Sequence, residues 1–451
     1  MFKKFTNGCV TLVQKYLPDP FLFCIFLTVI VFAFAIPLTS QSPLQMINHW
    51  GSGFWSLLAF AMQMALVLVL GTAMANSPPM QKVLKKLAEI PKTATQSILF
   101  VSFVSLVACW INWGFGLVVG AIFAKEIAKK GDKVDYPLLV ASAYSGFLIW
   151  HGGFSGSIPL TVATYSESLT TATGGVLTEA IPTSQTIFSL FNIAICGMLL
   201  VIIPIVNAKM HPSDDKVITI DPSLLHEEEE EEKIPSTPAE KVESSKIISI
   251  IIALFGIIYL GNYFITNGFK LDLNIVNLIF LVLGILFHGT PINYVNAITK
   301  ASKGAGGILL QFPFYAGIMG MMTGANPETG VSLAGFISSG FISVANQVTF
   351  PLFSFLSAGI VNFFVPSGGG QWAVQAPIMM PAGAALGVPE NITAMSIAWG
   401  DAWTNMLQPF WALPALGIAG LGARDIMGYC IIDLIVSGII ICGVFLLIGI
   451  V

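Results

Sequence analysis

Charged residues are scarce in this sequence. Only 10% of its 451 residues are Asp, Glu, Lys or Arg, whereas 55% are hydrophobic, and the mean hydropathy is +0.82. Soluble domains carry about 25% charged residues, so this deficit excludes an ordinary soluble globular protein. The formal net charge of −4 says little about partners, because one acidic run dominates it. We predict an all-α polytopic membrane protein that has the lipid bilayer, and no nucleic acid, as a partner.

Basic residues are absent from three long stretches. Residues 93–124, 134–208 and 304–423 contain no Lys or Arg. A dicarboxylate usually recruits a fixed Arg fork. An anion bound within these stretches would instead depend on helix N-termini, backbone N–H groups and hydroxyls. This composition favours a ligand with one carboxylate over a ligand with two.

Signatures of catalytic and metal sites are also lacking. The sequence has no His-x-x-His, Gly-x-Ser-x-Gly or Gly-x-x-x-x-Gly-Lys-Ser/Thr pattern. The six cysteines are scattered through apolar stretches without the spacing of metal ligands or of a disulfide framework. We therefore expect a protein that is not an enzyme and that needs no cofactor and no metal centre.

Several apolar runs are long enough to cross a membrane. Crossing the hydrocarbon core of ~30 Å takes about 20 helical residues. In the first half, such runs cover about residues 21–38, 53–75, 137–165 and 186–207. The region 2–16 carries three lysines and is expected to be an interfacial helix. One further span is expected at about 247–266, and the whole chain at about nine full spans plus two hairpins.

The two hairpins are expected where apolar stretches break near their middle. Residues 97–124 are interrupted at 112–116 (Asn-Trp-Gly-Phe-Gly), which leaves arms of about 13 residues, too short to span. In the other stretch Pro366 ends one helix, Ser367 and three glycines follow, and a new helix begins at about Gln371. A second kind of break, within a full span, is expected at Trp150-His151-Gly152-Gly153.

The two halves of the chain repeat one another. Pro43 corresponds to Pro291 and Trp150 to Trp403, at separations of 248 to 250 residues early and 253 to 255 later. We divide the chain into a first membrane repeat (1–207), an acidic, disordered cytoplasmic linker (208–245), and an extra span with a second repeat (246–451). The extra span inverts the second repeat. With a cytoplasmic N-terminus, 19 of the 20 basic residues fall inside. Inverted repeats with broken helices are a signature of secondary transporters.

Three motifs resemble the bacterial short-chain fatty acid transporter family. They are residues 17–21 (Leu-Pro-Asp-Pro-Phe), 365–372 (Val-Pro-Ser-Gly-Gly-Gly-Gln-Trp) and 399–405 (Trp-Gly-Asp-Ala-Trp-Thr-Asn). The similarity extends from end to end, with the acidic linker as the part expected to be peculiar to this chain. The resemblance implies uptake of short monocarboxylates such as acetoacetate or butyrate. It also implies kinship with a broad ion-transporter group that uses two hairpins and two broken helices.

The candidate site lies at the breaks. Asp401 is the best intramembrane ionisable group and could carry a coupling proton or help to bind Na⁺, or it could have a capping role. His151 could relay protons or be a satisfied structural residue, and Asp433 is interpreted mainly as a structural partner of Arg424. The residues expected to bind substrate are Asn112, Trp113, Gly114, Ser367, Gly368, Gly369, Gly370, Gln371, Trp403, Thr404 and Asn405.

The sequence thus predicts a secondary active transporter for short-chain monocarboxylates, coupled to a cation (H⁺ or Na⁺) and working by alternating access. A multi-pass location in the bacterial inner membrane and a homodimer are further expectations. Alternatives that remain open are a C4-dicarboxylate carrier, an amino-acid carrier and an uncoupled anion channel. Flux driven uphill by an imposed ion gradient would separate a carrier from a channel.

Overall fold

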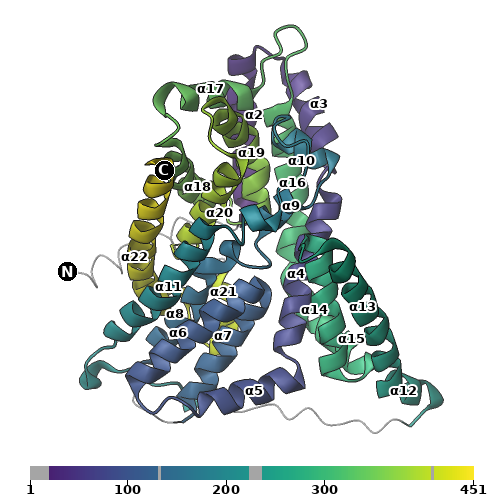
Figure 1. Ribbon diagram of the computed structural model, residues 1–451, viewed down its shortest axis with the longest axis vertical. Helices are drawn as coiled ribbons and strands as arrows, with labels where there is room; N and C mark the ends of the chain where they lie inside the picture. Colours follow the sequence, from purple (N-terminus) through teal and green to yellow (C-terminus); the bar gives the residue numbers. More distant parts are fainter. Residues whose placement is uncertain (1–19, 131–133, 223–235, 408–410, 451) are drawn as a thin grey trace.

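We describe the protein from a computed structural model that defines residues 20–130, 134–222, 236–407 and 411–450 (Figure 1). Every regular element in these ranges is a helix, so the all-α prediction is confirmed. The expected interfacial helix at 2–16, residues 17–19 of the first family motif and the acidic run at 227–232 lie outside the described residues.

The helices before residue 210 are α2 (Pro20–Thr39), α3 (Pro43–Gly53), α4 (Leu58–Ala75), α5 (Pro78–Ala88), α6 (Ala94–Ile111), α7 (Trp113–Ala128), α8 (Tyr136–Tyr144), the 3-10 helix η1 (Ser145–Gly152), α9 (Ser157–Ala163), α10 (Glu167–Ala172), η2 (Thr183–Gln185) and α11 (Leu190–Lys209). Those after it are η3 (Asp214–Lys216), α12 (Pro238–Glu243), α13 (Lys246–Asn267), α14 (Leu273–His288), α15 (Pro291–Ser302), η5 (Lys303–Ala305), α16 (Gly306–Thr323), α17 (Leu333–Val344), α18 (Phe350–Phe364), α19 (Gly368–Ala385), α20 (Glu390–Thr404), α21 (Ala412–Ala419) and α22 (Ala423–Ile450).

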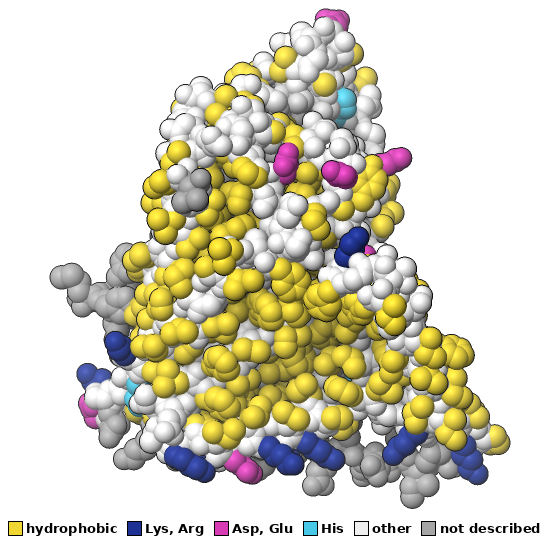
Figure 2. All heavy atoms as spheres, viewed as in Figure 1, with side chains coloured by type: hydrophobic (Ala, Val, Ile, Leu, Met, Phe, Trp, Pro, Cys, Tyr) yellow, Lys and Arg dark blue, Asp and Glu magenta, His cyan; other side chains and the backbone are white. Residues whose placement is uncertain are grey.

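Within the described residues, six helical stretches are long and apolar enough to cross a membrane. They are Leu58–Ala75, Ala94–Ile111, Leu190–Lys209, Lys246–Asn267, Pro291–Thr323 and Ala423–Ile450. Figure 2 shows a broad hydrophobic surface, with most of the Lys and Arg side chains of that face gathered along its lower edge. The chain is therefore a multi-pass membrane protein. The total of nine spans and the assignment of the basic edge to the cytoplasm stay predictions.

Corresponding positions of the two halves begin helices in the same way. Ser42 caps α3 by accepting a hydrogen bond from the backbone N–H of Gln45, and Pro43 follows as the first helical residue. Thr290 caps α15 through the N–H of Asn293, and Pro291 follows in turn. A hydroxyl cap followed by proline is a strong helix start. These matching starts support the internal repeat, which remains our prediction.

The two predicted hairpins lie at opposite ends of the molecule. In Figure 1, α6 and α7 occupy the lower half, whereas α18 and α19 lie in the upper half. The arms of the first hairpin are 18 and 16 residues long, rather than about 13. The break is shorter than expected because Asn112 alone interrupts the helix, and its Oδ1 accepts the N–H of Phe115 at 2.9 Å. Gly114 and Gly116 belong to α7.

The break in the second hairpin is also shorter than the sequence indicates. Ser367 caps α19, accepting the N–H of Gly370 at 3.4 Å, and the three glycines form the first turn of this helix. The first broken span is α8, η1 and α9. Its middle segment η1 is an eight-residue 3-10 helix, a form that rarely extends beyond 3–4 residues. The corresponding second span consists of α20 and α21.

Parts of the predicted linker carry local structure. The N–H of Tyr136 donates to Ile218 O at 2.7 Å, and the N–H of Ile218 donates to Asp135 Oδ2 at 3.1 Å, which attaches this segment to the start of α8. In α12, hydrogen bonds from the backbone N–H groups of Thr237 and Ser236 lower the pKa of Glu240 to about 2. The division into two repeats and a disordered linker stays a prediction.

Candidate functional site

The two ionisable residues singled out in the sequence form a buried pair. His151 Nε2 lies 3.2 Å from Asp401 Oδ1, across 250 residues of sequence, and both residues have 0% exposure. His151 lies near the end of η1 and Asp401 in the last turn of α20, so the pair joins the two broken spans. His151 Nδ1 and Asp401 Oδ2 have no hydrogen-bond partner among the described residues.

Amide side chains hold Asp401 on its other sides. Asn405 Nδ2 donates to Asp401 Oδ1 at 3.4 Å. Asn362 Nδ2, from α18, lies 2.9 Å from the carbonyl oxygen of Asp401 and 3.0 Å from Thr404 Oγ1. The structure thus places Thr404 and Asn405 beside Asp401, together with Asn362, which the sequence reasoning missed, and the roles of these residues stay predictions. The signal of Asn362 was a lone polar amide within an apolar run.

The tip of the second hairpin packs directly against the pair. A Cβ atom at Gly368 would lie 2.6 Å from His151 Nε2, one at Gly369 would lie 2.5 Å from Phe60 Cε1, and one at Gly370 would lie 2.5 Å from Tyr315 Cδ2. The glycines thus permit close packing onto η1, α4 and α16 in this conformation. Their role in binding substrate stays a prediction.

Tryptophan side chains connect the two hairpin tips. Trp113, which follows the break at Asn112, lies 5.0 Å from Trp411 and 5.8 Å from Trp150 between ring centroids. The indole N–H of Trp411 donates to the carbonyl oxygen of Pro366 at 2.9 Å, at the other break. The backbone N–H of Trp113 donates to Ser155 Oγ at 2.9 Å. An aromatic wall therefore lies between the two helix breaks.

Two predicted residues lie outside this cluster. Trp403 is on another face of α20 from Asp401: its indole N–H donates to Leu434 O at 2.7 Å, and its ring packs 4.9 Å from Phe355. Gly114 faces α4, where a Cβ atom would meet Leu68 Cα at 3.0 Å. The structure therefore places both positions in helix packing.

Besides His151 Nδ1, several buried polar atoms around the breaks lack hydrogen-bond partners among the described residues. Donors among them are Asn112 Nδ2, Trp113 Nε1 and Trp150 Nε1. Acceptors among them are Asn362 Oδ1, Gln371 Oε1 and Asp401 Oδ2. Buried polar groups without hydrogen bonds are costly and rare in native proteins. The donors suit an anion and the acceptors suit a cation. Within the described residues, no group of three His, Cys, Asp or Glu side chains could hold a metal ion.

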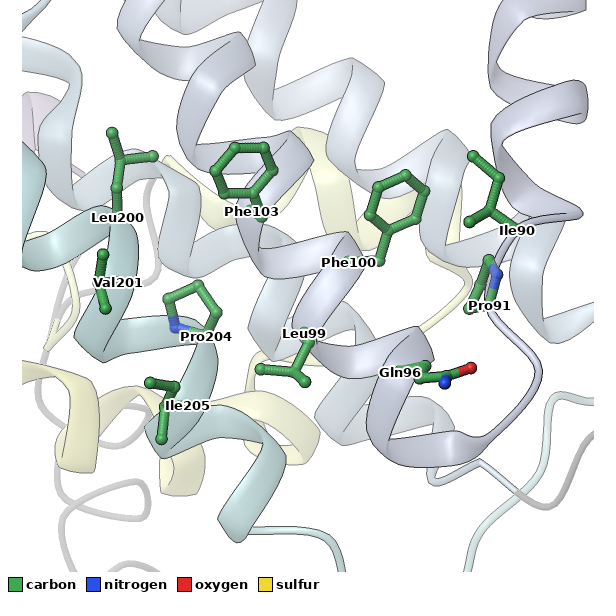
Figure 3. Close-up of a pocket in the computed structure, with 10 residues that line it drawn as sticks. All are labelled: Ile90, Pro91, Gln96, Leu99, Phe100, Phe103, Leu200, Val201, Pro204 and Ile205. Carbon is green, nitrogen blue, oxygen red and sulfur yellow. The ribbon is translucent and has the colours of Figure 1, made fainter.

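A cavity of about 450 Å³ lies elsewhere, between α6 and α11 (Figure 3). Its walls are apolar apart from Gln96, and they include Phe103 and Val201, whose side chains are 48% and 61% exposed. An apolar groove on the outer face of membrane helices suits a hydrocarbon chain and offers little to a carboxylate. The buried pair, whose two residues have 0% exposure in this conformation, therefore stays the candidate site.

The fold and this buried polar centre define a polytopic, all-helical membrane protein with an ionisable pair in its interior. Comparison with known proteins makes the class specific. A family model described as "Short chain fatty acid transporter" matches residues 1–448, and the chain belongs to this family. A relative from Escherichia coli (strain K12) is 48% identical over 443 residues, covering 98% of both chains, and carries short-chain fatty acid transporter as a provisional name. A Haemophilus influenzae relative with the same provisional name is 46% identical, covering 99% of this chain and 100% of its own.

Solved structures support the fold. The YdaH transporter of Alcanivorax borkumensis aligns with a TM-score of 0.59 at 16% identity, covering 96% of this chain and 98% of its own. MtrF of Neisseria gonorrhoeae, described as illuminating a class of antimetabolite efflux pumps, aligns with a TM-score of 0.53 at 16% identity, covering 97% of both chains. These likenesses concern the fold alone.

Proposed function

We propose that this chain takes up short-chain monocarboxylates, such as butyrate or acetoacetate, in symport with a cation and by alternating access. The observation that carries the proposal is the His151–Asp401 pair, which is fully buried where the two broken spans meet a hairpin tip. An ionisable pair at such a depth is expensive and marks a transport pathway by default. Membership of the family supplies the class of substrate.

The chemistry of the site supports a small anion with one carboxylate. Lys and Arg are absent from both broken spans and from the second hairpin, and the first hairpin carries only Lys125, in the last turn of α7. The unpartnered N–H groups of Asn112, Trp113 and Trp150 could bind one carboxylate, and the rings of Trp113, Trp150 and Trp411 could cover a short alkyl chain. A second carboxylate would have no Arg fork to bind it.

The coupling cation would act at Asp401. Its Oδ2 is an unpartnered acceptor, which could take H⁺ or bind Na⁺ together with amide oxygens such as that of Asn362. Leu148, the sequence counterpart of Asp401 in the first repeat, is apolar, so only one half supplies a carboxyl. One monocarboxylate entering with one monovalent cation moves no net charge, so this symport would be nearly independent of membrane voltage.

Three further parts of the proposal concern the membrane, the topology and the oligomeric state. We place the protein in the bacterial inner membrane, with inverted repeats and a cytoplasmic linker, and we expect a homodimer. The main rival is an amino-acid carrier: over 161 residues the chain is 26% identical to YfcC of Escherichia coli (strain K12), provisionally named a basic amino acid antiporter, covering 33% of this chain and 31% of that protein. Within the described residues, the unpartnered polar atoms of the site include one carboxyl oxygen, Asp401 Oδ2, and no acidic cluster. This composition disfavours a substrate with a basic side chain.

Uptake by purified protein in liposomes tests the proposal. Labelled butyrate, acetoacetate and succinate would be compared with and without an inward Na⁺ gradient, and protein-free liposomes would correct for the passive entry of the neutral acids. We expect saturable uptake of the two monocarboxylates and none of succinate. Preferred uptake of succinate or of a basic amino acid would refute the proposed substrate class, and flux that no ion gradient can drive uphill would indicate a channel.

A further inference from the structure

A second buried carboxyl lies away from the His151–Asp401 pair. Asp433 has 0% exposure and lies about 15 Å along α22 from its first residue, Ala423, at 1.5 Å per residue. The expected pairing with Arg424 is wrong, because Arg424 is exposed and the described residues contain no ion pair to Asp433. An ionised carboxylate in such surroundings would be a buried charge without a counter-ion.

The partner of Asp433 is an amide on α11. One terminal atom of the Asn207 side chain lies 3.0 Å from Asp433 Oδ1 and 3.2 Å from Oδ2. The other terminal atom lies 3.0 Å from Ser102 Oγ on α6 and 3.1 Å from Ser145 Oγ at the start of η1. All four side chains have 0% exposure. The cluster therefore connects α6, η1, α11 and α22 away from water.

The amide of Asn207 can make these contacts in two orientations. With its oxygen toward Asp433, it accepts a hydrogen bond from a protonated carboxyl, and its NH₂ group donates to both serine hydroxyls. Ser145 then donates to Ser142 O at 2.7 Å. With the amide turned over, its NH₂ group donates to both oxygens of an ionised carboxylate, and the two serines donate to the amide oxygen. Each orientation fits one protonation state of Asp433.

The cluster is connected to the proposed coupling site through the backbone at Tyr144–Ser145 and the hydrogen bonds that Tyr144 and Asn405 make. Ser145 is the first residue of η1, and His151 lies near its end. The hydroxyl of Tyr144, directly before η1, donates to the carbonyl oxygen of Asn405 at 2.8 Å, and Asn405 contacts the carboxylate of Asp401. A change in the hydrogen bonds of Ser145 therefore occurs at the base of the segment that positions His151.

We propose that Asp433 is a proton-binding site, and that the Asn207 side-chain amide turns over when Asp433 gains or loses its proton. In the closed conformation Asp433 carries a proton, because an ionised form would be a desolvated charge held by one amide. When the amide turns over, the hydroxyl of Ser145 changes from accepting a hydrogen bond from Asn207 to donating one. The protonation state of Asp433 therefore alters the hydrogen bonds at the start of η1. This proposal rests on the proposed function in one respect: the transport cycle has to open the cluster to water.

Other titratable or charged groups lie on the helices around Asp433. On the elements that pack against α22, or that contact the cluster, they are Cys109 on α6, Tyr136 and Tyr144 on α8, His151 on η1, Cys196 and Lys209 on α11, Glu390 and Asp401 on α20, and Arg424, Asp425, Tyr429, Cys430 and Cys442 on α22 itself. Asp433 is the carboxyl that directly contacts Asn207, so its removal isolates its own contribution.

Infrared spectroscopy of the reconstituted protein tests the assignment without any transport measurement. We expect the parent at neutral pH to show the C=O stretching band of a protonated carboxyl that is lost in Asp433→Asn. Asp425→Asn is the matched control, since Asp425 is an exposed carboxyl in the first turn of the same helix. An identical band in the parent and in Asp433→Asn would overturn the proposal.

Two further measurements keep the test decisive. Should Asp433→Asn fail to insert, Asp433→Glu keeps a carboxyl, and we expect its infrared band to move. An unmoved band would contradict the assignment.

In substrate exchange, which requires no gradient, we expect the pH profile of Asp433→Asn to lose one titrating group relative to the parent and to Asp425→Asn. Superimposable profiles would show that Asp433 has only a structural role and would overturn the proposal. Because the infrared result does not depend on the substrate, it separates failure here from failure of the proposed function.

Discussion

Gly368 is the position at which one added methyl group would reach the buried pair. The new Cβ atom of Gly368→Ala would lie 2.6 Å from His151 Nε2, 2.7 Å from His151 Cε1 and 2.9 Å from Trp150 Cη2. Carbon atoms in contact prefer about 3.5–4.0 Å, and both side chains are at most 2% exposed, so neither can move away freely. Overpacking of this kind costs about 1–3 kcal/mol. A shift of that size changes the population of the closed conformation by about 5–150-fold.

If the closed conformation is an obligatory step of transport, Gly368→Ala lowers the rate of substrate exchange by about the same 5–150-fold. The assay is exchange of labelled acetoacetate in liposomes, normalised to the amount of inserted protein. Gly197→Ala on α11 is the control, since a Cβ there meets nothing within 4 Å, and alanine stabilises an exposed helix by about 0.5–1 kcal/mol relative to glycine. A Gly368→Ala protein that exchanges substrate at the parental rate would refute this reasoning.

Three other predictions follow from neighbouring contacts and from the topology. We expect Gly369→Val and Gly370→Val to insert but to lose transport, because their side chains would overlap Phe312 and Tyr315; near-normal uptake by both would contradict the packing. Trp411→Phe removes the indole N–H that donates to Pro366 O and should weaken the hairpin tip by about 0.5–1.5 kcal/mol, a smaller loss of exchange than that of Gly368→Ala. A cysteine at residue 230, in a chain otherwise free of cysteine, should react only with reagents that reach the cytoplasm; labelling from outside would exclude the inverted topology.

Much of the fold could be predicted because its signals are local. The breaks at Asn112 and Ser367 are helix caps within apolar runs, and a residue with a capping side chain that has a glycine one or two positions later is visible in sequence. The extent of the breaks was overestimated because glycine was expected to stay outside helices. In the structure, close packing compensates for its low helix propensity: a Cβ at Gly370 would meet Tyr315.

The site could be predicted only in part, because its contacts join distant segments. Asp401 and His151 were both identified as isolated ionisable residues in apolar surroundings, but no pattern in sequence shows that they meet across 250 residues. Trp403 was grouped with Asp401 by proximity along the chain, yet the two project from different faces of α20. Asn362 is the single amide of the apolar helix α18 and Asn207 is one of two in α11, which is a weak signal, and their partners became evident only from the packing.

Accumulation and exchange by Asp401→Asn test the central claim most directly. The substitution keeps the shape of the side chain and removes its charge and proton. For one-to-one coupling to H⁺, a gradient of one pH unit supplies 1.36 kcal/mol, or about tenfold accumulation above protein-free liposomes, and an imposed Na⁺ gradient is the parallel arm. We predict that Asp401→Asn retains acetoacetate exchange within about tenfold of the parent while accumulation falls to the background under both gradients. Parental accumulation by Asp401→Asn under either gradient would contradict the account, since Asp401 would then be structural and coupling would have to be sought at His151 or around Ser367, Thr404 and Asn405.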